Sequence, residues 1–350
     1  MKILIVDSHK GTRYRQTNLH WLNAEAMAIY LDSVGHDVDF IWSYPSVNSE
    51  LKSGYDMILF NHASRYSYVD RDIIDMNPNA HYFYVTNEYN LGDALILYDG
   101  VKRLGLTYDV ISNFKLILED MTFFFGKDAI QENHVVNLNT LIYRDIDFSD
   151  GSLFPMEKPK KSDCLYWGSF RKDRVKYFNK YLSHIKVSTS PKNSEKFVAS
   201  GVSADFIPRI DWFKDGLWEF KYSLYIEDEY THKVFNNLSN RFYESIMYDV
   251  IPLFDINCKN TVEKSGIEFN DWLYVSSVEE LQAKVDSEPP QEIYELVSRW
   301  KAQALEDKVI CLESIENMLK ARLGTVPNRL EIQEEKKKEK KVRVNKLDFI

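Results

Sequence analysis

A small-residue turn that carries two arginines is the segment of the sequence best suited to chemistry. The stretch 166–174 reads YWGSFRKDR and follows a short apolar run that predicts a strand. Small residues such as Gly168 and Ser169, where a strand turns into a helix, let backbone N–H groups approach a phosphate. Arg171 and Arg174 are suited to bidentate contacts with a diphosphate. The alternative is a surface turn whose arginines extend into water.

A second segment, NRFYESIM at 240–247, pairs an arginine with a glutamate. Arg241 and Glu244 lie three positions apart, so they share one face of a predicted helix. Phe242 and Ile246 fall roughly opposite and are expected to pack. An arginine for phosphate and a glutamate for ribose hydroxyls would form a nucleotide grip. The alternative is an ion pair on the helix surface.

Alternating strands and helices must position both segments. In the first half of the chain, apolar runs predict strands at 2–7, 36–42, 56–62, 81–86 and 108–113, with helices at 21–34, closed by Gly35, and 93–104. Residues 150–161 contain Gly151, Pro155 and Pro159 and predict a linker. After it, strands are predicted at 164–168, 185–190, 205–210, 222–227, 250–255 and 272–275, and helices at 173–182, 194–200, 236–248 and 290–323.

This alternation predicts an α/β protein with two Rossmann-like domains, each a parallel sheet with helices on both faces. The expected division is 1–155 for the first domain and 162–325 for the second. Residues 326–350 would form a helix or basic tail that crosses back to the first domain. Ligands of open parallel sheets bind beyond the carboxyl ends of the strands, so a cleft between the two halves is the expected site.

Composition bounds the class of protein. A chain of 350 residues suits two domains. The net charge of −9 weighs against wholesale wrapping of nucleic acid, although a local basic surface is compatible with it. The 13 glycines form neither G-x-G nor a P-loop, which argues against the common dehydrogenases and P-loop enzymes.

Metal, disulfide and membrane signals are weak. Three widely spaced cysteines indicate a reducing compartment without a disulfide framework. The eight histidines lack metal-ligand spacings, and D-x-D triplets are expected by chance among 53 acidic residues, so no metal ligand is predicted. The charged N-terminus is not typical of a signal peptide, and no apolar stretch reaches 18 residues. We therefore expect a cytoplasmic protein with no membrane segment.

The segment 336–346 carries seven basic residues and one acid. One interpretation is a solvated helix end. The other is an arm that contacts phosphates and gives an acidic protein local positive charge.

Together, the two motifs resemble the phage DNA β-glucosyltransferases, two-domain enzymes of the glycosyltransferase B (GT-B) architecture. Those enzymes transfer glucose from UDP-glucose to 5-hydroxymethylcytosine in duplex DNA. The GSFR turn at 168–171 is similar to the family's turn, and Arg174 lies near its second diphosphate arginine. The Arg-x-x-Glu pattern implies that Arg241 contacts diphosphate and Glu244 holds the ribose. Asp228, at the end of a predicted strand, resembles a further family aspartate.

The acceptor half departs from the family pattern. The family's general base is an aspartate where this sequence has Asn87, and an amide cannot take a proton. Glu88 is the nearest carboxylate and is the predicted base, with Asp93 further along the loop as a poorer candidate. A family glutamate near the sugar falls close to Asn23, with Glu25 two residues later.

The resemblance implies a monomeric enzyme that transfers a hexose by direct displacement at the anomeric carbon. UDP-glucose is the expected donor, and the expected acceptor is the hydroxymethyl group of a modified pyrimidine in double-stranded phage DNA, bound by the first domain. Mg²⁺ or Mn²⁺ is compatible with this chemistry but is not required by the sequence. Two alternatives stay open: a glycan or small-molecule acceptor, and a non-catalytic protein that binds nucleotide sugars or DNA.

Overall fold

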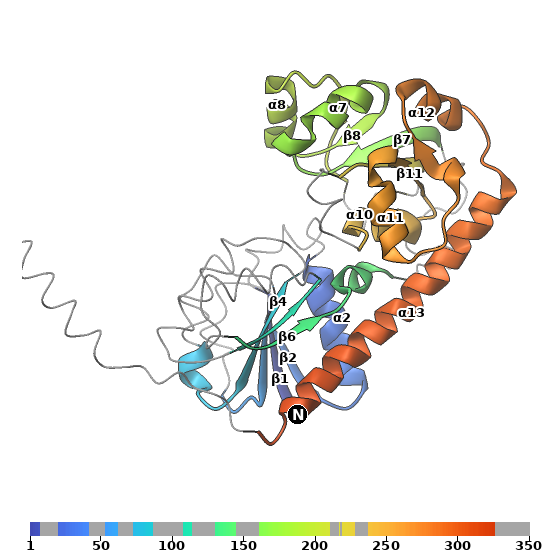
Figure 1. Cartoon of the computed structure of the whole chain (residues 1–350). Coiled ribbons are helices and arrows are strands. Elements are labelled where there is room, and N and C mark those ends of the chain that lie inside the picture. The colour runs from blue at the N-terminus through green and yellow to red at the C-terminus, as the bar shows by residue number, and fades with distance from the viewer. Residues whose placement is uncertain are drawn as a thin grey trace, which may run out of the picture.

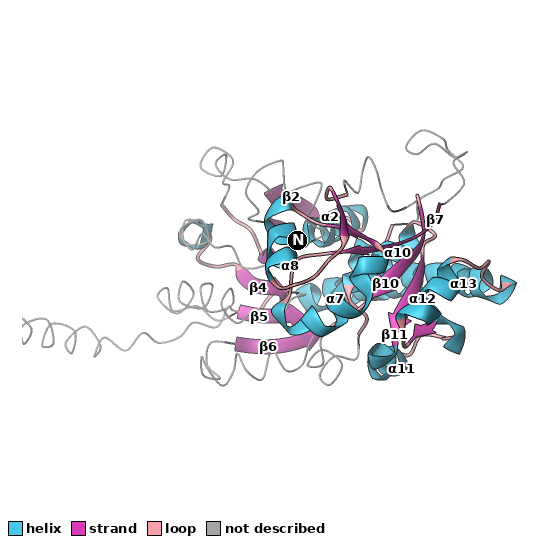
Figure 2. Cartoon of the chain, turned by 90° about the horizontal axis from the view of Figure 1, so that it is seen from above, coloured by secondary structure: helices cyan, strands magenta, loops and turns pink. Residues whose placement is uncertain are grey.

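The protein is built on two parallel six-stranded sheets, as seen in a computed structural model (Figure 1). This confirms the predicted α/β class. Figure 2 shows the arrangement from above, with β4, β5 and β6 side by side in the first sheet and β7, β10 and β11 in the second. The structure describes residues 1–7, 20–41, 53–61, 73–86, 108–113, 130–144, 161–210, 217, 219–227 and 237–325.

The first sheet has the strand order β2-β1-β3-β4-β5-β6, with every pair parallel. Its strands are β1 (Lys2–Asp7), β2 (Asp37–Ile41), β3 (Met57–Asn61), β4 (His81–Thr86), β5 (Tyr108–Ser112) and β6 (Ile130–Val135). The central strands are continuous apolar runs because both faces of a parallel sheet are covered. Strand β6, with the sequence IQENHV, was not predicted, since an edge strand carries polar residues that hide the pattern.

One face of this sheet is covered by α2 (His20–Ser33). Ala24, Met27 and Leu31 project from it into a core shared with the sheet. The helix ends where the sequence predicts, because Gly35 takes a left-handed φ of 91° and the following N–H of His36 donates to Leu31 O at 3.1 Å.

The second sheet has the order β12-β11-β10-β7-β8-β9 and is also parallel. Its strands are β7 (Lys161–Trp167), β8 (Lys186–Ser188), β9 (Asp205–Ile207), β10 (Phe220–Tyr225), β11 (Ile251–Asp255) and β12 (Tyr274–Val275). Its helices are α7 (Val175–Tyr181), α8 (Pro191–Ala199), α10 (Asn240–Met247), α11 (Lys259–Ser265) and α12 (Val278–Val285). Short 3-10 helices also connect its elements: η3 (Lys172–Arg174), η4 (Leu182–His184), η5 (Ile256–Cys258) and η6 (Asp271–Leu273). One more, η1 (Leu138–Ile142), belongs to the first half of the chain and follows β6.

The strand order of the second sheet reverses between β7 and β10. The chain runs outward from β7 to β9 on one side, then returns and runs from β10 to β12 on the other. Open parallel sheets bind ligands at such a switch point, beyond the carboxyl ends of the two central strands. The topology therefore directs attention to the residues that follow β7 and β10.

The 32-residue helix α13 (Gln291–Arg322) joins both cores, and in Figure 1 it runs from beside the second half of the chain to the base of the first sheet. Its first half packs into the second core through Leu296 and Trp300, and its second half packs into the first core through Leu312 and Ile315. Burying each such side chain contributes roughly 1.5–3 kcal/mol. Helix α13, within the predicted second domain of 162–325, thus already reaches the core of the first sheet, while the predicted tail at 326–350 lies outside the described residues.

Some predicted features lie outside the described residues. They are the helix at 93–104, most of the linker at 150–161 and the basic segment at 336–346. Among the helices that are described, none is both long and apolar enough to cross a membrane.

Lys308, near the middle of α13, provides a test of this packing. Its ammonium group donates to Tyr143 O at 2.7 Å, and burial, with a smaller effect of Arg144, lowers its pKa from 10.5 to about 8. Between these two values the unfolded chain binds the proton and the folded chain does not, so stability must rise with pH. We expect the wild type to gain stability relative to Lys308→Met between pH 8 and pH 10.5.

Urea unfolding at a series of pH values measures this difference. Lys192→Met, at an exposed position of α8, corrects for the loss of a surface lysine. A stability difference between wild type and Lys308→Met that does not change with pH would show that Lys308 is solvated.

Candidate functional site

Gly168 forms the turn at the carboxyl end of β7. Its φ of +145° is a conformation that L side chains rarely adopt, and a Cβ here would stand 3.2 Å from Nη2 of Arg241. The Gly168 carbonyl accepts a hydrogen bond from Thr189 Oγ1 at 2.8 Å, which ties the turn to the segment after β8. Backbone geometry and the adjacent guanidinium therefore both favour glycine at this position.

A buried carboxylate, Glu227, joins two arginines beside this turn. Its Oε2 lies 2.5 Å from Nη2 of Arg174, and its Oε1 lies 3.1 Å from Nη1 of Arg241. Ser239 Oγ also donates to Oε1, at 2.9 Å. The exposed fractions are 4% for the Glu227 side chain, 13% for Arg174 and 11% for Arg241. Because two guanidinium groups share one carboxylate, this group, which we call the arginine triad, keeps one positive charge in excess.

Arg241 is fixed on several sides. Its Nε donates to Trp167 O at 3.3 Å and its Nη1 to Ile226 O at 3.1 Å, while the guanidinium lies 4.7 Å from the centre of the Tyr166 ring. Burial by itself would lower the pKa of Arg241, but Tyr166 and Glu227 outweigh that effect and raise it. Among the described residues, Nη2 bonds only to the Tyr166 hydroxyl, at 3.5 Å. This nitrogen is the one that faces the Gly168 turn.

Glu244 lies on α10, one turn after Arg241, and is 3% exposed. The indole N–H of Trp167 donates to its carboxylate. The alternative of an exposed Arg241–Glu244 ion pair is therefore wrong, because Glu244 is buried and the Arg241 side chain is only 11% exposed. The Arg174 side chain is similarly half-buried, whereas Ser169 and Arg171 are exposed.

The residues predicted for the acceptor side are only partly described. Asn23 is 1% exposed on α2, and its Oδ1 has no hydrogen-bond partner in the described part of the chain. Glu25 forms an ion pair with Arg144. The remaining predicted residues, Asn87, Glu88, Asp93 and Asp228, lie outside the described residues.

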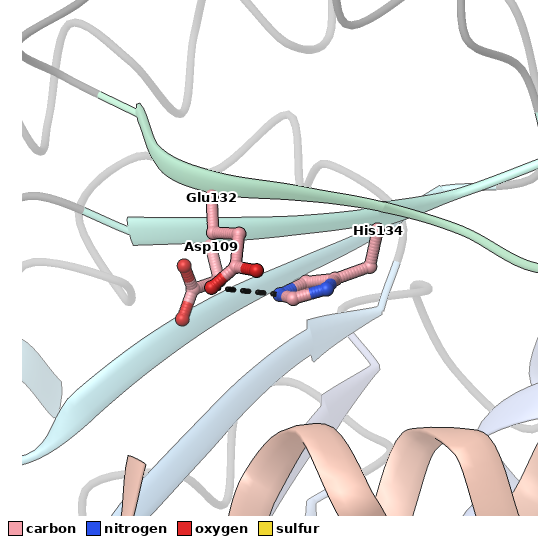
Figure 3. Close-up of side chains that lie close together, drawn as sticks. All are labelled: Asp109, Glu132 and His134. Carbon is pink, nitrogen blue, oxygen red and sulfur yellow. Dashed lines mark ion pairs between the residues drawn. The ribbon is translucent and has the colours of Figure 1, made fainter. Parts of the chain in front are cut away.

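A cluster of Asp109, Glu132 and His134 has the composition of a metal site (Figure 3). One ligand atom from each lies within 4.8 Å of the others. However, Arg322 at the end of α13 donates to both oxygens of Asp109, at 2.8 and 2.9 Å, and to Glu132 at 2.5 Å. A guanidinium thus already takes the carboxylate oxygens that a cation would need.

The position of this cluster also argues against a role in metal-assisted chemistry. Asp109 and Glu132 stand near the starts of β5 and β6, at the sheet edge opposite the carboxyl ends. These residues do not fit a metal ion, and the group fastens α13 to the first sheet. No sequence pattern indicates this group, since Asp109, Glu132 and Arg322 are distant along the chain.

The role of Arg322 can be measured. Arg322→Ala leaves buried Asp109 without its cation, and removing one partner of a buried ion pair costs about 3–5 kcal/mol. We expect a correspondingly lower melting temperature in calorimetry, and no change in the wild type when Mn²⁺ or a chelator is added. Stabilisation of the wild type by Mn²⁺ that is lost in Asp109→Asn would contradict this assignment.

Comparisons with known proteins show relatives only at the level of structure. No known family model matches the chain, and no curated protein matches its sequence. The structure of T4 phage BGT in complex with UDP and Mn²⁺ matches at 15% identity with a TM-score of 0.60, over 91% of this chain and 99% of that one. The chain has the GT-B fold.

Two further structures share the GT-B fold. An alpha-glucosyltransferase (AGT) in complex with UDP matches at 10% identity with a TM-score of 0.60, over 91% of this chain and 100% of that one. An alpha-glucosyltransferase with UDP and a 13-mer DNA containing an HMU base matches at 12% identity with a TM-score of 0.52, over 91% and 99%. At these low sequence identities the structural similarity establishes only the fold. This GT-B fold is the one that the resemblance in sequence implied.

Sequence reasoning missed Glu227, the residue that organises the site. It named the neighbouring Asp228 because of the family pattern. The available signal was a carboxylate two residues beyond the end of β10, at a switch point that also presents Gly168. A buried glutamate between two candidate arginines is expected there, since unpaired arginines are rarely buried.

Proposed function

We propose that the chain is a UDP-sugar-dependent hexosyltransferase that transfers glucose to the hydroxymethyl group of a modified pyrimidine in double-stranded DNA. The observation that carries the proposal is the arginine triad beside the Gly168 turn, at the switch point of a GT-B fold. Two structural neighbours that bind UDP, T4 phage BGT and AGT, support the choice of nucleotide.

The donor would bind with its diphosphate at the Gly168 turn. Nη2 of Arg241 faces this turn, and Arg171 stands exposed at its outer side. In a direct displacement, negative charge develops on the leaving diphosphate, and guanidinium groups fixed beforehand stabilise it without reorganising. Arg174 and Arg241 are fixed in this way by Glu227, and Glu244 is proposed to hold the ribose.

The acceptor hydroxyl requires a base. We assign this role to Glu88, with Asn87 orienting the acceptor, and a positioned base contributes roughly 10²–10⁴-fold to the rate. Asn23 and Glu25 of α2 are proposed to contact the sugar or the acceptor, and Asp93 is the second candidate for the base. Arg322 pairs with the carboxylates of the Asp109 cluster, so no step is assigned to a metal ion there.

The choice of DNA as acceptor is supported by the neighbour that binds a 13-mer DNA with an HMU base. A base within duplex DNA must be flipped out of the stack to reach a bound donor, at a cost of a few kcal/mol. The basic segment 336–346 is proposed to offset part of that cost by contacting phosphates.

Gly168→Ala tests the donor site with a matched control. The new Cβ would displace Nη2 of Arg241, so UDP should bind about tenfold more weakly, as expected for losing one charged hydrogen bond. Gly201→Ala places the same residue at a φ of +78° with nothing within 4 Å, so it costs stability without touching the site. Calorimetric titration measures the UDP affinity of both variants. Equal affinities would show that the diphosphate does not bind at the Gly168 turn.

Transfer itself is tested with radiolabelled UDP-glucose and three acceptors: hydroxymethylated duplex DNA, unmodified duplex DNA and a panel of glycans. We expect label only on hydroxymethylated DNA, and loss of transfer with retained UDP binding in Glu88→Gln. Label on glycans would show that the acceptor is a glycan and not DNA. UDP binding without any transfer would support a non-catalytic protein. Full activity of Glu88→Gln would leave Asp93 as the candidate for the base.

A further inference from the structure

Buried asparagines connect the two sheets at their carboxyl ends. Asn113 directly follows β5, and its Nδ2 donates to Oδ1 of Asn139 at 2.8 Å. Asn139, in η1, donates in turn through Nδ2 to Leu238 O, also at 2.8 Å. From the other side, Asn237 Nδ2 donates to Asn113 O at 3.3 Å. The first half of the chain thus holds residues 237–238, which immediately precede the helix of the donor site.

The contacts continue from Leu238 to the arginine triad. The next residue, Ser239, is the N-cap of α10, and its Oγ donates to Oε1 of Glu227 at 2.9 Å. Its backbone N–H is held by the Tyr225 hydroxyl at 2.8 Å. Glu227 then binds Arg174 and Arg241. An unbroken series of hydrogen bonds and one peptide unit therefore runs from Asn139 to both arginines.

A second contact between the two halves lies beside the first. Asn137 Nδ2 donates to the Tyr243 hydroxyl at 2.9 Å, and Tyr243 stands between Phe242 and Glu244 on α10. Asn137 and Asn139, two positions apart in one segment, thus hold the middle of α10 and the residue that precedes its N-cap. Helix α10 is consequently positioned by the first half of the chain as well as by its own sheet.

The amide of Asn139 is specifically suited to this place. Its side chain is 5% exposed, its oxygen accepts from Asn113 and its nitrogen donates to a backbone carbonyl, so both ends are used. An aspartate of the same shape would turn a carboxylate oxygen toward Leu238 O, where neither atom can donate. The substitution would push residue 238 away from η1 and shift the hydroxyl of Ser239 relative to Glu227.

We infer that Asn139, although it belongs to the first half of the chain, is a positioning residue for the donor site: through Leu238, Ser239 and Glu227 it fixes the arginines for the diphosphate of a nucleotide. This inference rests on the proposed function. It also gives a direct physical connection between η1, which packs on α2 of the first half, and nucleotide binding in the second.

The test compares two ligands in the full-length chain. Asn139→Asp should weaken binding of UDP about 5- to 150-fold, the usual range for coupling between linked sites, as measured by calorimetric titration. Binding of uridine, followed by ligand-observed NMR, should stay within about twofold. Uridine has no diphosphate for the arginines to contact, and Glu244, proposed to hold its ribose, is held separately by the Trp167 indole. General loosening of the fold would weaken both ligands alike.

Asn77→Asp is the matched control. Asn77 is 3% exposed, and its amide likewise donates to a backbone carbonyl, Ile73 O, and accepts a backbone N–H, that of Tyr55. It precedes β4, at the edge of the first sheet away from the carboxyl ends. We expect Asn77→Asp to lower the melting temperature while UDP affinity stays at the wild-type value.

The outcomes separate the inference from the proposed function. If the wild type does not bind UDP, the proposed function fails. If the wild type binds UDP and Asn139→Asp binds it equally well, or loses UDP and uridine affinity in parallel, the inference is overturned. Should Asn139→Asp not fold, Asn139→Ala removes the same donor without adding charge, and the same selective loss of UDP affinity is required of it.

Discussion

The sharing of one buried carboxylate by two arginines is the interaction on which the rest of the site depends. Removing charged groups from water is costly, and the cost is met only when every ion is paired and hydrogen-bonded. Glu227 meets this condition with Arg174, Arg241 and Ser239. The carbonyls of Trp167 and Ile226 accept hydrogen bonds from Nε and Nη1 of Arg241, which places Nη2 against Gly168, a residue without a side chain.

This arrangement requires that two sheets keep a fixed relation. The long helix α13 provides that relation through apolar packing, since it contributes side chains to both cores. Polar contacts fix the relative positions of these parts more closely. Arg322 binds the end of the helix to β5 and β6, and Asn139 of η1 binds Leu238, just before α10. The charged site, the shared helix and the amide contacts therefore act together, although they come from distant parts of the sequence.

The sequence predicted the central strands and α13 well, because continuous apolar runs and long helical periodicity reflect burial directly. It missed β6, whose edge position leaves polar residues in the strand, and it missed the short helices α11 and α12. In the site, it identified Gly168, Arg174, Arg241 and Glu244 from residue types at a turn and on a helix face. Asn139 and Arg322 could not be found in this way, because their importance comes from partners that only the folded chain brings near. Glu227 was missed although its place after β10, between two candidate arginines, was a signal.

A crystal structure of the full chain with UDP would show whether the arginine triad binds a diphosphate. We expect diphosphate oxygens within hydrogen-bond distance of the backbone at Gly168 and of the Arg241 guanidinium, with Glu227 still between the two arginines. A nucleotide bound elsewhere, or a diphosphate that reaches neither Arg174 nor Arg241, would contradict the proposed donor site.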